Sequence, residues 1–212
     1  MTKVKICGIT NVDNARFAIS CGVDYLGFIF APSPRKIIKE TAARIMKETP
    51  DFNNYVGVFL NAKKKHVEEI CSYARLRIVQ FHGEETPAFC NYFIKRGLDV
   101  IKVFHVKDKD SFSKIEQYNK IGMIFFDTYS EDANGGTGKI FNWSLINKID
   151  ILKNKKVFVS GGLDSKNVRE LIELVHPYAV DASSKLESKV GIKDNNKVKD
   201  FIDIVHGVKM ND

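Results

Sequence analysis

Several short apolar runs in this chain end in residues that can transfer protons. Cys7 ends the run at 4–7, Asp127 ends the run at 122–127, and His82 follows the run at 77–81. A thiolate can take a proton, a carboxylic acid can give one, and an imidazole can do either. A purely structural role is the alternative for each of these residues, because a cysteine in a strand is usually a small buried hydrophobe, and an aspartate or histidine can anchor a loop through hydrogen bonds.

Two other runs end in residues that suit an anion. Gly161 and Gly162 follow the run at 156–160, and the run at 178–181 leads into Ser183 and Ser184. A glycine turn exposes backbone N–H groups, and the serines add hydroxyls, so the two segments together predict a phosphate cradle. The alternative is that the glycines serve only tight turns.

Further polar segments flank these residues. Asp164 and Ser165 are the expected N-caps of the helix after the glycine turn, and Arg35 in "APSPRKI" is either a binding residue or a surface arginine. The stretch "NGGTGK" at 134–139 does not match the P-loop pattern, and we interpret it as a flap over the site.

The elements that must position these residues form a repeated unit of an apolar run followed by a helix-like stretch. Helical spacing of apolar residues is clear in three stretches, at 67–74, 168–175 and 198–205, each with apolar residues at i, i+3, i+4 and i+7. The eight runs lie at 4–7, 25–30, 55–60, 77–81, 99–104, 122–127, 156–160 and 178–181.

Alternating strands and helices indicate parallel strands joined by crossover helices. Eight units in 212 residues favour a single α/β domain over 1–212 with a (β/α)8 barrel fold. An open doubly wound sheet is the alternative, although no GxGxxG follows the first run. In a barrel the chemistry lies at the carboxyl ends of the strands, where the residues described above are found.

Composition limits the other possibilities. Four cysteines without CxxC spacing make a disulfide framework or zinc site unexpected, and no secretory leader or membrane span is recognisable, so we expect a cytoplasmic protein without a membrane partner. The net charge of +7 comes from lysines spread along the whole chain. Such a spread indicates a solvated basic surface that attracts anionic substrates, not a nucleic-acid partner.

Six segments in order resemble one enzyme family over nearly the whole chain. They are "KICGIT", "GFIFAPSPR", "VQFHGEE", the "DT" that precedes "GGTGKIFNW", "SGGL" and "VDASS". The chain resembles phosphoribosylanthranilate isomerase of tryptophan biosynthesis. The resemblance implies a barrel that uses neither a metal nor a cofactor. It also implies conversion of N-(5-phosphoribosyl)anthranilate to 1-(2-carboxyphenylamino)-1-deoxyribulose 5-phosphate, an Amadori rearrangement, by a monomer or homodimer.

The resemblance also assigns residues. It implies Cys7 as general base, Asp127 as general acid and Arg35 at the anthranilate end of the substrate. The remaining substrate-binding residues expected are His82, Gly161, Gly162, Ser183 and Ser184. One departure is Lys185, which stands where the family pattern predicts glycine after "DASS".

The two proton-transfer roles require shifted pKa values. A free aspartic acid is ionised at neutral pH and a free cysteine is mostly a thiol, so we expect burial to raise the pKa of Asp127 and a cation to lower that of Cys7. Lys5 and Arg35 are the candidate cations.

Three other functions compete with this interpretation. A ribulose-phosphate epimerase would need several metal-binding histidines and aspartates, and His82 alone fits poorly. A histidine-pathway isomerase would be expected to have an aspartate in place of Cys7. A basic nucleic-acid-binding protein without catalysis would show salt-sensitive retention on DNA or RNA.

Overall fold

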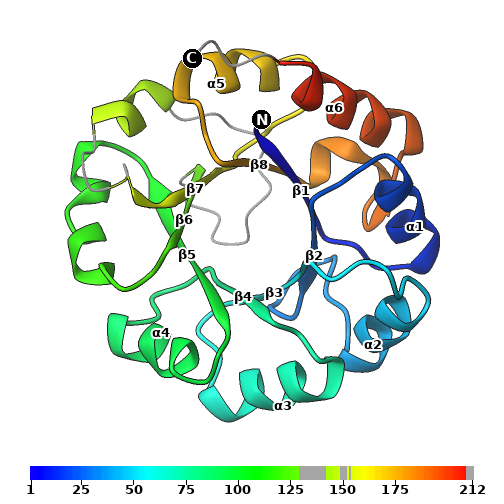
Figure 1. Ribbon diagram of the computed structural model, residues 1–212, viewed down its shortest axis with the longest axis horizontal. Coiled ribbons are helices and arrows are strands. Elements are labelled where there is room, and N and C mark those ends of the chain that lie inside the picture. The colour runs from blue at the N-terminus through cyan, green and yellow to red at the C-terminus, as the bar shows by residue number, and fades with distance from the viewer. Residues whose placement is uncertain (129–141, 149–151, 153, 209–212) are drawn as a thin grey trace.

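The computed structural model describes residues 1–128, 142–148, 152 and 154–208, and it contains a closed barrel of eight parallel strands (Figure 1). Consecutive strands are neighbours, and β1 pairs with both β2 and β8, so the barrel has no free edge. The (β/α)8 prediction is therefore confirmed. The strands are β1 Lys3–Cys7, β2 Tyr25–Ile29, β3 Tyr55–Phe59, β4 Ile78–Phe81, β5 Asp99–Val106, β6 Met123–Thr128, β7 Lys156–Val159 and β8 Ala179–Ala182.

The helices surround the barrel (Figure 1). Three of the six α-helices begin at a side-chain cap, where Asn11, Thr86 and Asp194 each accept a hydrogen bond from a backbone N–H of the first turn that follows. The α-helices are α1 Val12–Ser20, α2 Lys39–Lys47, α3 Lys64–Ala74, α4 Pro87–Ile94, α5 Val168–Val175 and α6 Asn195–Gly207. The apolar stripes predicted at 67–74, 168–175 and 198–205 lie on α3, α5 and α6 and contact the core.

Strict alternation of strands and α-helices is wrong after β5. Two 3₁₀ helices, η1 Lys109–Phe112 and η2 Ile115–Tyr118, connect β5 to β6. The apolar residues there, Phe112, Ile115 and Tyr118, recur every three positions and pack on the core. That spacing matches the three residues per turn of a 3₁₀ helix rather than the 3.6 of an α-helix. The 3₁₀ helix η3 Trp143–Lys148 follows the same rule with Trp143 and Ile146 buried.

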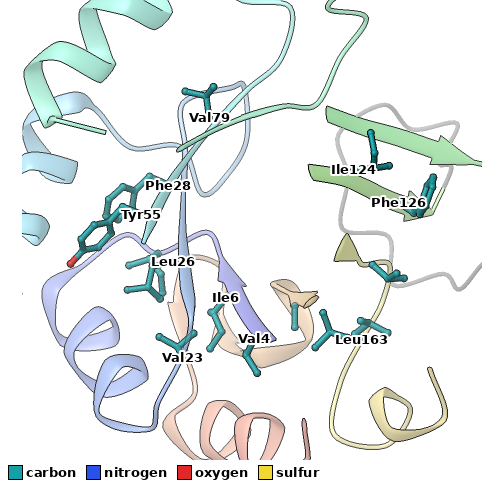
Figure 2. Close-up of a cluster of buried hydrophobic side chains, with 14 of the residues drawn as sticks. Val4, Ile6, Val23, Leu26, Phe28, Tyr55, Val79, Ile124, Phe126 and Leu163 are labelled. Atoms are coloured by element: carbon teal, nitrogen blue, oxygen red, sulfur yellow. The ribbon is translucent and has the colours of Figure 1, made fainter. Parts of the chain in front are cut away.

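Side chains that alternate along each strand build two apolar layers. The outer layer lies between the strands and the helices, and Figure 2 shows Val4 and Ile6 of β1 and Leu26 and Phe28 of β2 within it. The inner layer fills the barrel. Its members are Tyr25, Val56, Ile78, Ile101, Val103, Met123, Phe125, Phe158 and Ala179. All of these side chains are buried, so the barrel interior is a packed core and not a channel, and fully burying one large apolar side chain stabilises the fold by about 1.5–3 kcal/mol.

The inner layer ends below the carboxyl ends of the strands, where polar side chains replace apolar ones. Past β8 the chain forms the short 3₁₀ helix η5 Ser184–Leu186 and a small hairpin of β9 Glu187–Lys189 and β10 Ile192–Lys193. These elements lie on the same side of the barrel as Cys7, because Ser183 donates a hydrogen bond to the Cys7 carbonyl oxygen (3.0 Å). In the described part of the chain, no helix has the length and apolar character needed to cross a membrane.

Candidate active site

Asp127 lies near the carboxyl end of β6 and is held by three donors. Its Oδ1 accepts hydrogen bonds from the Ser160 hydroxyl (2.6 Å) and the Thr128 N–H (2.8 Å), and its Oδ2 lies 3.4 Å from His82 Nε2. Burial by itself would raise the pKa of Asp127. The hydrogen bond and charge of His82, together with the Ser160 hydrogen bond, outweigh burial and hold the pKa below its ordinary value.

His82 is itself oriented by two residues that sequence reasoning missed. The Gln80 side-chain nitrogen lies 3.1 Å from His82 Nδ1, and His105 Nε2 lies 3.0 Å from the His82 carbonyl oxygen. Alternation along β4 places Gln80 on the same face as His82, a signal that was available in the sequence. His105 was missed because the predicted run stopped at 104, whereas β5 continues to Val106.

A buried ion pair beneath the β4 loop holds His82 in place. Lys102 of β5 is 3 % exposed and donates hydrogen bonds to the carbonyl oxygens of Phe81 (3.3 Å) and Val103 (3.1 Å). Its ammonium lies 3.5 Å from Glu85, whose carboxylate accepts the Gly83 N–H (2.9 Å). These contacts hold the backbone of Phe81 and Gly83 on either side of His82, from which its ring extends toward Asp127.

Cys7 ends β1 and is buried beside a charged neighbour. Its strand partner Gly27 leaves room for it, since a Cβ there would lie 2.8 Å from the Cys7 Sγ and 3.2 Å from Lys5 Nζ. Burial raises the pKa of the Cys7 thiol, and the hydrogen-bonded Lys5 ammonium opposes that rise without cancelling it. Lys5 is therefore the cation at Cys7 that the sequence left undecided.

Lys5 is fully buried and forms an ion pair with Asp181 at 2.7 Å. The two residues are register partners on β1 and β8, so the closure of the barrel brings them together. Burial by itself would lower the pKa of Lys5, but Asp181 and Cys7 hold it above the ordinary value. Asp181 also interacts electrostatically with both Cys7 and Asp127. Cys7, Lys5, Asp127 and Asp181 therefore lie together at the carboxyl-end opening of the barrel, which we call its mouth.

Both expected pKa shifts at Cys7 and Asp127 are wrong in sign. Asp127 is stabilised as a carboxylate because its donors outweigh burial, and Cys7 is stabilised as a thiol because burial outweighs its cation. The resting site therefore carries its proton on sulfur. The form needed for catalysis, with Cys7 as a thiolate and Asp127 as a carboxylic acid, has the same number of protons as the resting form. The two forms differ only in whether the proton is on the sulfur of Cys7 or on the carboxyl group of Asp127.

Arg35 is partly buried and ion-paired, and is not a free surface arginine. Its Nε and Nη2 donate to the two carboxylate oxygens of Glu187 at 2.7 and 2.8 Å, and Lys193 reaches the same carboxylate at 3.0 Å. Its side chain passes over Gly8, where a Cβ would lie 2.8 Å from the Arg35 Cδ. Arg35 thus lies close enough to Cys7 to interact with it electrostatically, and within the described residues its Nη1 makes no hydrogen bond.

The glycine turn after β7 has the backbone predicted for a close approach. Gly161 and Gly162 have φ values of +103° and +66°, a region that L side chains rarely adopt. A Cβ at Gly161 would also collide with the side chain of Thr128. The turn therefore lies beside Thr128, the residue that follows Asp127.

The segment after this turn differs from the prediction in one respect. The expectation that Asp164 and Ser165 cap the next helix is wrong, because α5 begins at Val168 with Asn167 at its N-cap. Asn167 instead ties the turn together by accepting the Asp164 N–H (3.0 Å) and donating to the Gly162 carbonyl oxygen (3.0 Å). The caps were misplaced because a turn at 165–167 separates loop and helix.

The serines after β8 divide into two positions. Ser183 donates its hydroxyl to the Cys7 carbonyl oxygen, and Ser184 begins η5. Lys185, which departs from the family pattern, is exposed in η5 and is not among the residues with positive φ, so this backbone does not require glycine. The predicted flap at 134–139 lies outside the described residues.

Proton-transfer groups and glycine-rich turns at the carboxyl ends of the strands define the class of this protein, a (β/α)8-barrel enzyme of acid–base chemistry. A family model described as N-(5'-phosphoribosyl)anthranilate isomerase matches residues 4–204. The isomerase of that name from Geotalea uraniireducens (strain Rf4) is 45% identical over 209 residues, covering 98% of this chain and 100% of the relative.

Solved structures agree with this match. Phosphoribosyl anthranilate isomerase from Thermotoga maritima superimposes with a TM-score of 0.90 at 40% identity, covering 98% of this chain and 100% of that one. An isomerase structure in complex with reduced 1-(o-carboxyphenylamino)-1-deoxyribulose 5-phosphate gives a TM-score of 0.87 at 38% identity, with the same coverage. The chain belongs to the N-(5'-phosphoribosyl)anthranilate isomerase family.

The chain is accordingly an intramolecular aldose–ketose isomerase. It converts N-(5-phosphoribosyl)anthranilate to 1-(2-carboxyphenylamino)-1-deoxyribulose 5-phosphate in tryptophan biosynthesis. This assignment decides against the phosphosugar epimerase and the histidine-pathway isomerase that the sequence left open.

Proposed function

We propose that Asp127 and Cys7 perform the two proton transfers of this Amadori rearrangement. Asp127 protonates the furanose ring oxygen, the C–O bond breaks, and the anthranilate nitrogen lone pair forms the iminium ion. Cys7 then removes the C2 proton as a thiolate, and the enolamine tautomerises to the aminoketone product. The observation that carries the proposal is that both groups lie at one barrel mouth, electrostatically linked through Asp181.

The resting protonation state shapes this mechanism. The reactive form, with Cys7 as thiolate and Asp127 as acid, is a minor species because the pKa of each group is shifted in the opposite direction. His82, whose Nε2 faces Asp127 Oδ2, donates to the carboxylate and stabilises it after the proton has left. His82 therefore stabilises the ionised form of Asp127 that is present after ring opening.

The remaining site residues are proposed to bind the two ends of the substrate. Arg35 receives the anthranilate carboxylate on its Nη1 side, because Glu187 occupies the opposite side of the guanidinium. Gly161, Gly162, Ser183 and Ser184 receive the phosphate, supported by the left-handed glycines and by the position of both serines after β8. The product analogue bound to a relative supports a phosphoribosyl ligand of this kind.

The same proposal covers the setting of the enzyme. Strand β1 begins at Lys3 and α6 ends at Gly207, which supports one catalytic domain over 1–212. All four cysteines are unpaired, as suits the reducing cytoplasm. One relative is described as a dimeric isomerase from which monomers were generated, and sedimentation equilibrium decides between monomer and homodimer for this chain.

Turnover of freshly prepared phosphoribosylanthranilate, followed by the change in fluorescence expected on isomerisation, tests the proposal. We expect the purified chain to turn over in EDTA and both Cys7→Ser and Asp127→Asn to lose kcat while the far-ultraviolet spectrum stays unchanged. Activity of either variant within a few-fold of the wild type would remove that residue from the mechanism. Loss of wild-type turnover in EDTA would contradict catalysis without a metal.

A further inference from the structure

Three potential metal ligands meet at the mouth of the barrel. Within the described residues, His82, His105 and Asp127 each offer one ligand atom, and these atoms all lie within 4.8 Å of one another. His105 and Asp127 are register partners on the adjacent strands β5 and β6. The two imidazole rings meet edge to face with centroids 5.0 Å apart. We propose that these residues form a binding site for a divalent first-row transition metal ion such as Zn²⁺, and that metal binding inhibits the enzyme.

The spacing of the donors suits such an ion. Metal–ligand bonds of about 2.0–2.1 Å place neighbouring ligands of a tetrahedral zinc ion about 3.4 Å apart. His82 Nε2 and Asp127 Oδ2 already lie 3.4 Å apart. The ligand atom of His105 lies no more than 4.8 Å from the other two, so His105 is the ligand that moves closer when an ion binds. The side chains of His82 and Asp127 are 22 % and 17 % exposed, so an ion can reach them from the mouth.

The groups behind the three ligands already orient them. The Asp127 Oδ1 is occupied by the Ser160 hydroxyl and the Thr128 N–H, which leaves Oδ2 for the metal. His105 Nε2 faces the His82 carbonyl oxygen, which can only accept, so Nε2 carries the hydrogen and Nδ1 keeps its lone pair. Metal-binding histidines in proteins are held by such contacts to their second nitrogen.

Gln80 completes this arrangement. Its side-chain oxygen is buried and has no hydrogen-bond partner among the described residues. When His82 binds a metal through Nε2, its Nδ1 carries the hydrogen, and a turn of the Gln80 amide brings that unpartnered oxygen to accept it. The amide thus serves either tautomer of His82, donating to Nδ1 in the metal-free site and accepting from it in the bound one.

The ligand types and nearby charges select the ion. Two imidazoles and one carboxylate suit Zn²⁺, Co²⁺ or Ni²⁺, whereas Mg²⁺ and Ca²⁺ prefer oxygen ligands. Asp181 adds a negative charge that acts on Asp127, and the positive charge of Lys102 is offset by Glu85. The Cys7 thiol is a poorer choice for the ion because the Lys5 ammonium lies beside it.

The inhibition, though not the binding, rests on the acid role proposed for Asp127. A carboxylate bound to a metal cannot carry the proton for the furanose oxygen, and a metal-bound His82 cannot donate to Asp127. Binding also needs an ionised Asp127 and a lone pair on each histidine, so protons compete with the metal. Turnover is therefore expected to fall as the site fills.

Titration of Co²⁺ into the full chain near neutral pH tests the site by a signal independent of turnover. We expect a visible absorption band that saturates at one ion per chain, is lost when Zn²⁺ is added and persists in excess Mg²⁺. His105→Gln should weaken binding about tenfold or more, since it removes a ligand while an amide can still reach the His82 carbonyl. His66→Gln, at an exposed histidine of α3, is the matched control and should bind like the wild type.

Activity measurements complete the test. Saturating Zn²⁺ should abolish wild-type turnover, EDTA should restore it, and His105→Gln should need about ten times more Zn²⁺ or above. Equal Co²⁺ affinity in His105→Gln and the wild type, or a thiolate-to-cobalt charge-transfer band, would overturn the site. Full turnover with the site saturated would leave the site standing and overturn the acid role of Asp127.

Discussion

The buried ion pair of Lys5 and Asp181 gives the sharpest test of how the fold controls the pKa of Cys7, the proposed general base. Lys5 has no exposed surface, and Asp181 lies 2.7 Å from its ammonium. Replacing Lys5 with Met leaves the Asp181 charge buried without its partner, which destabilises a fold by about 3–5 kcal/mol. We therefore expect a large fall in the free energy of unfolding of Lys5→Met, measured by urea denaturation.

The double variant Lys5→Met, Asp181→Leu separates stability from catalysis. Removing both charges and filling the space with apolar groups should bring the free energy of unfolding back to within about 1 kcal/mol of the wild type. It cannot restore the cation at Cys7. Lys5 lowers the pKa of Cys7 by more than Asp181 raises it, so we expect the pKa of Cys7 to rise when both are removed and kcat/KM near neutral pH to fall, by about tenfold.

The rate of alkylation by iodoacetamide as a function of pH measures the pKa of the Cys7 thiol directly. Burial raises the pKa of Cys71 and Cys90 to about 12, so neither reacts near neutral pH. Cys21 is partly exposed, and the measurement is made in a Cys21→Ser background. Cys7 in the double variant should then be alkylated about tenfold more slowly at a given pH. A stable double variant with wild-type kcat/KM and an unchanged thiol pKa would refute the reasoning.

Three further predictions concern the proton-transfer pair and the two binding ends. The pH profile of kcat/KM should be a flat-topped bell, because between the two pKa values the thiolate fraction of Cys7 rises with pH while the acid fraction of Asp127 falls. Cys7→Ser should lose the low-pH limb and Asp127→Asn the high-pH limb, and each variant should have kcat lowered about 10²–10⁴-fold. A limb that persists in its variant would contradict the assignment. Arg35→Lys and Glu187→Gln should both raise KM by about tenfold, since the first removes the planar guanidinium and the second weakens the contact that holds the guanidinium in position. Unchanged kcat and KM in these variants would indicate that Arg35 has only a structural role. Gly162→Val should raise KM sharply with little change in kcat, because its φ of +66° excludes a β-branched residue, and an unaltered KM would place the phosphate elsewhere.

Much of the fold was predictable because it depends on local patterns. Each of the eight predicted runs overlaps a strand of the barrel, and the stripes on α3, α5 and α6 lie where the 3.6-residue spacing places them. Because parallel strands of a barrel all end at one mouth, Cys7 and Asp127 could be assigned to a common site from their positions alone.

The tertiary structure decided which groups touch, since contacts across the barrel leave no local pattern. Lys5 and Asp181 are 176 positions apart, and Arg35 and Glu187 are 152 apart.

The signs of the pKa shifts also came from the tertiary structure alone. Residue type and strand position predict that Cys7 and Asp127 are candidates for proton transfer, but a pKa depends on the balance between burial and the hydrogen bonds of neighbours. At Asp127 the donors His82 and Ser160 lie just past the ends of β4 and β7, and at Cys7 the burial results from closure of the barrel. The sequence by itself therefore determined that Cys7 and Asp127 lie at the carboxyl ends of their strands, and the closed barrel determined which neighbours each of them contacts and which of the two holds the proton.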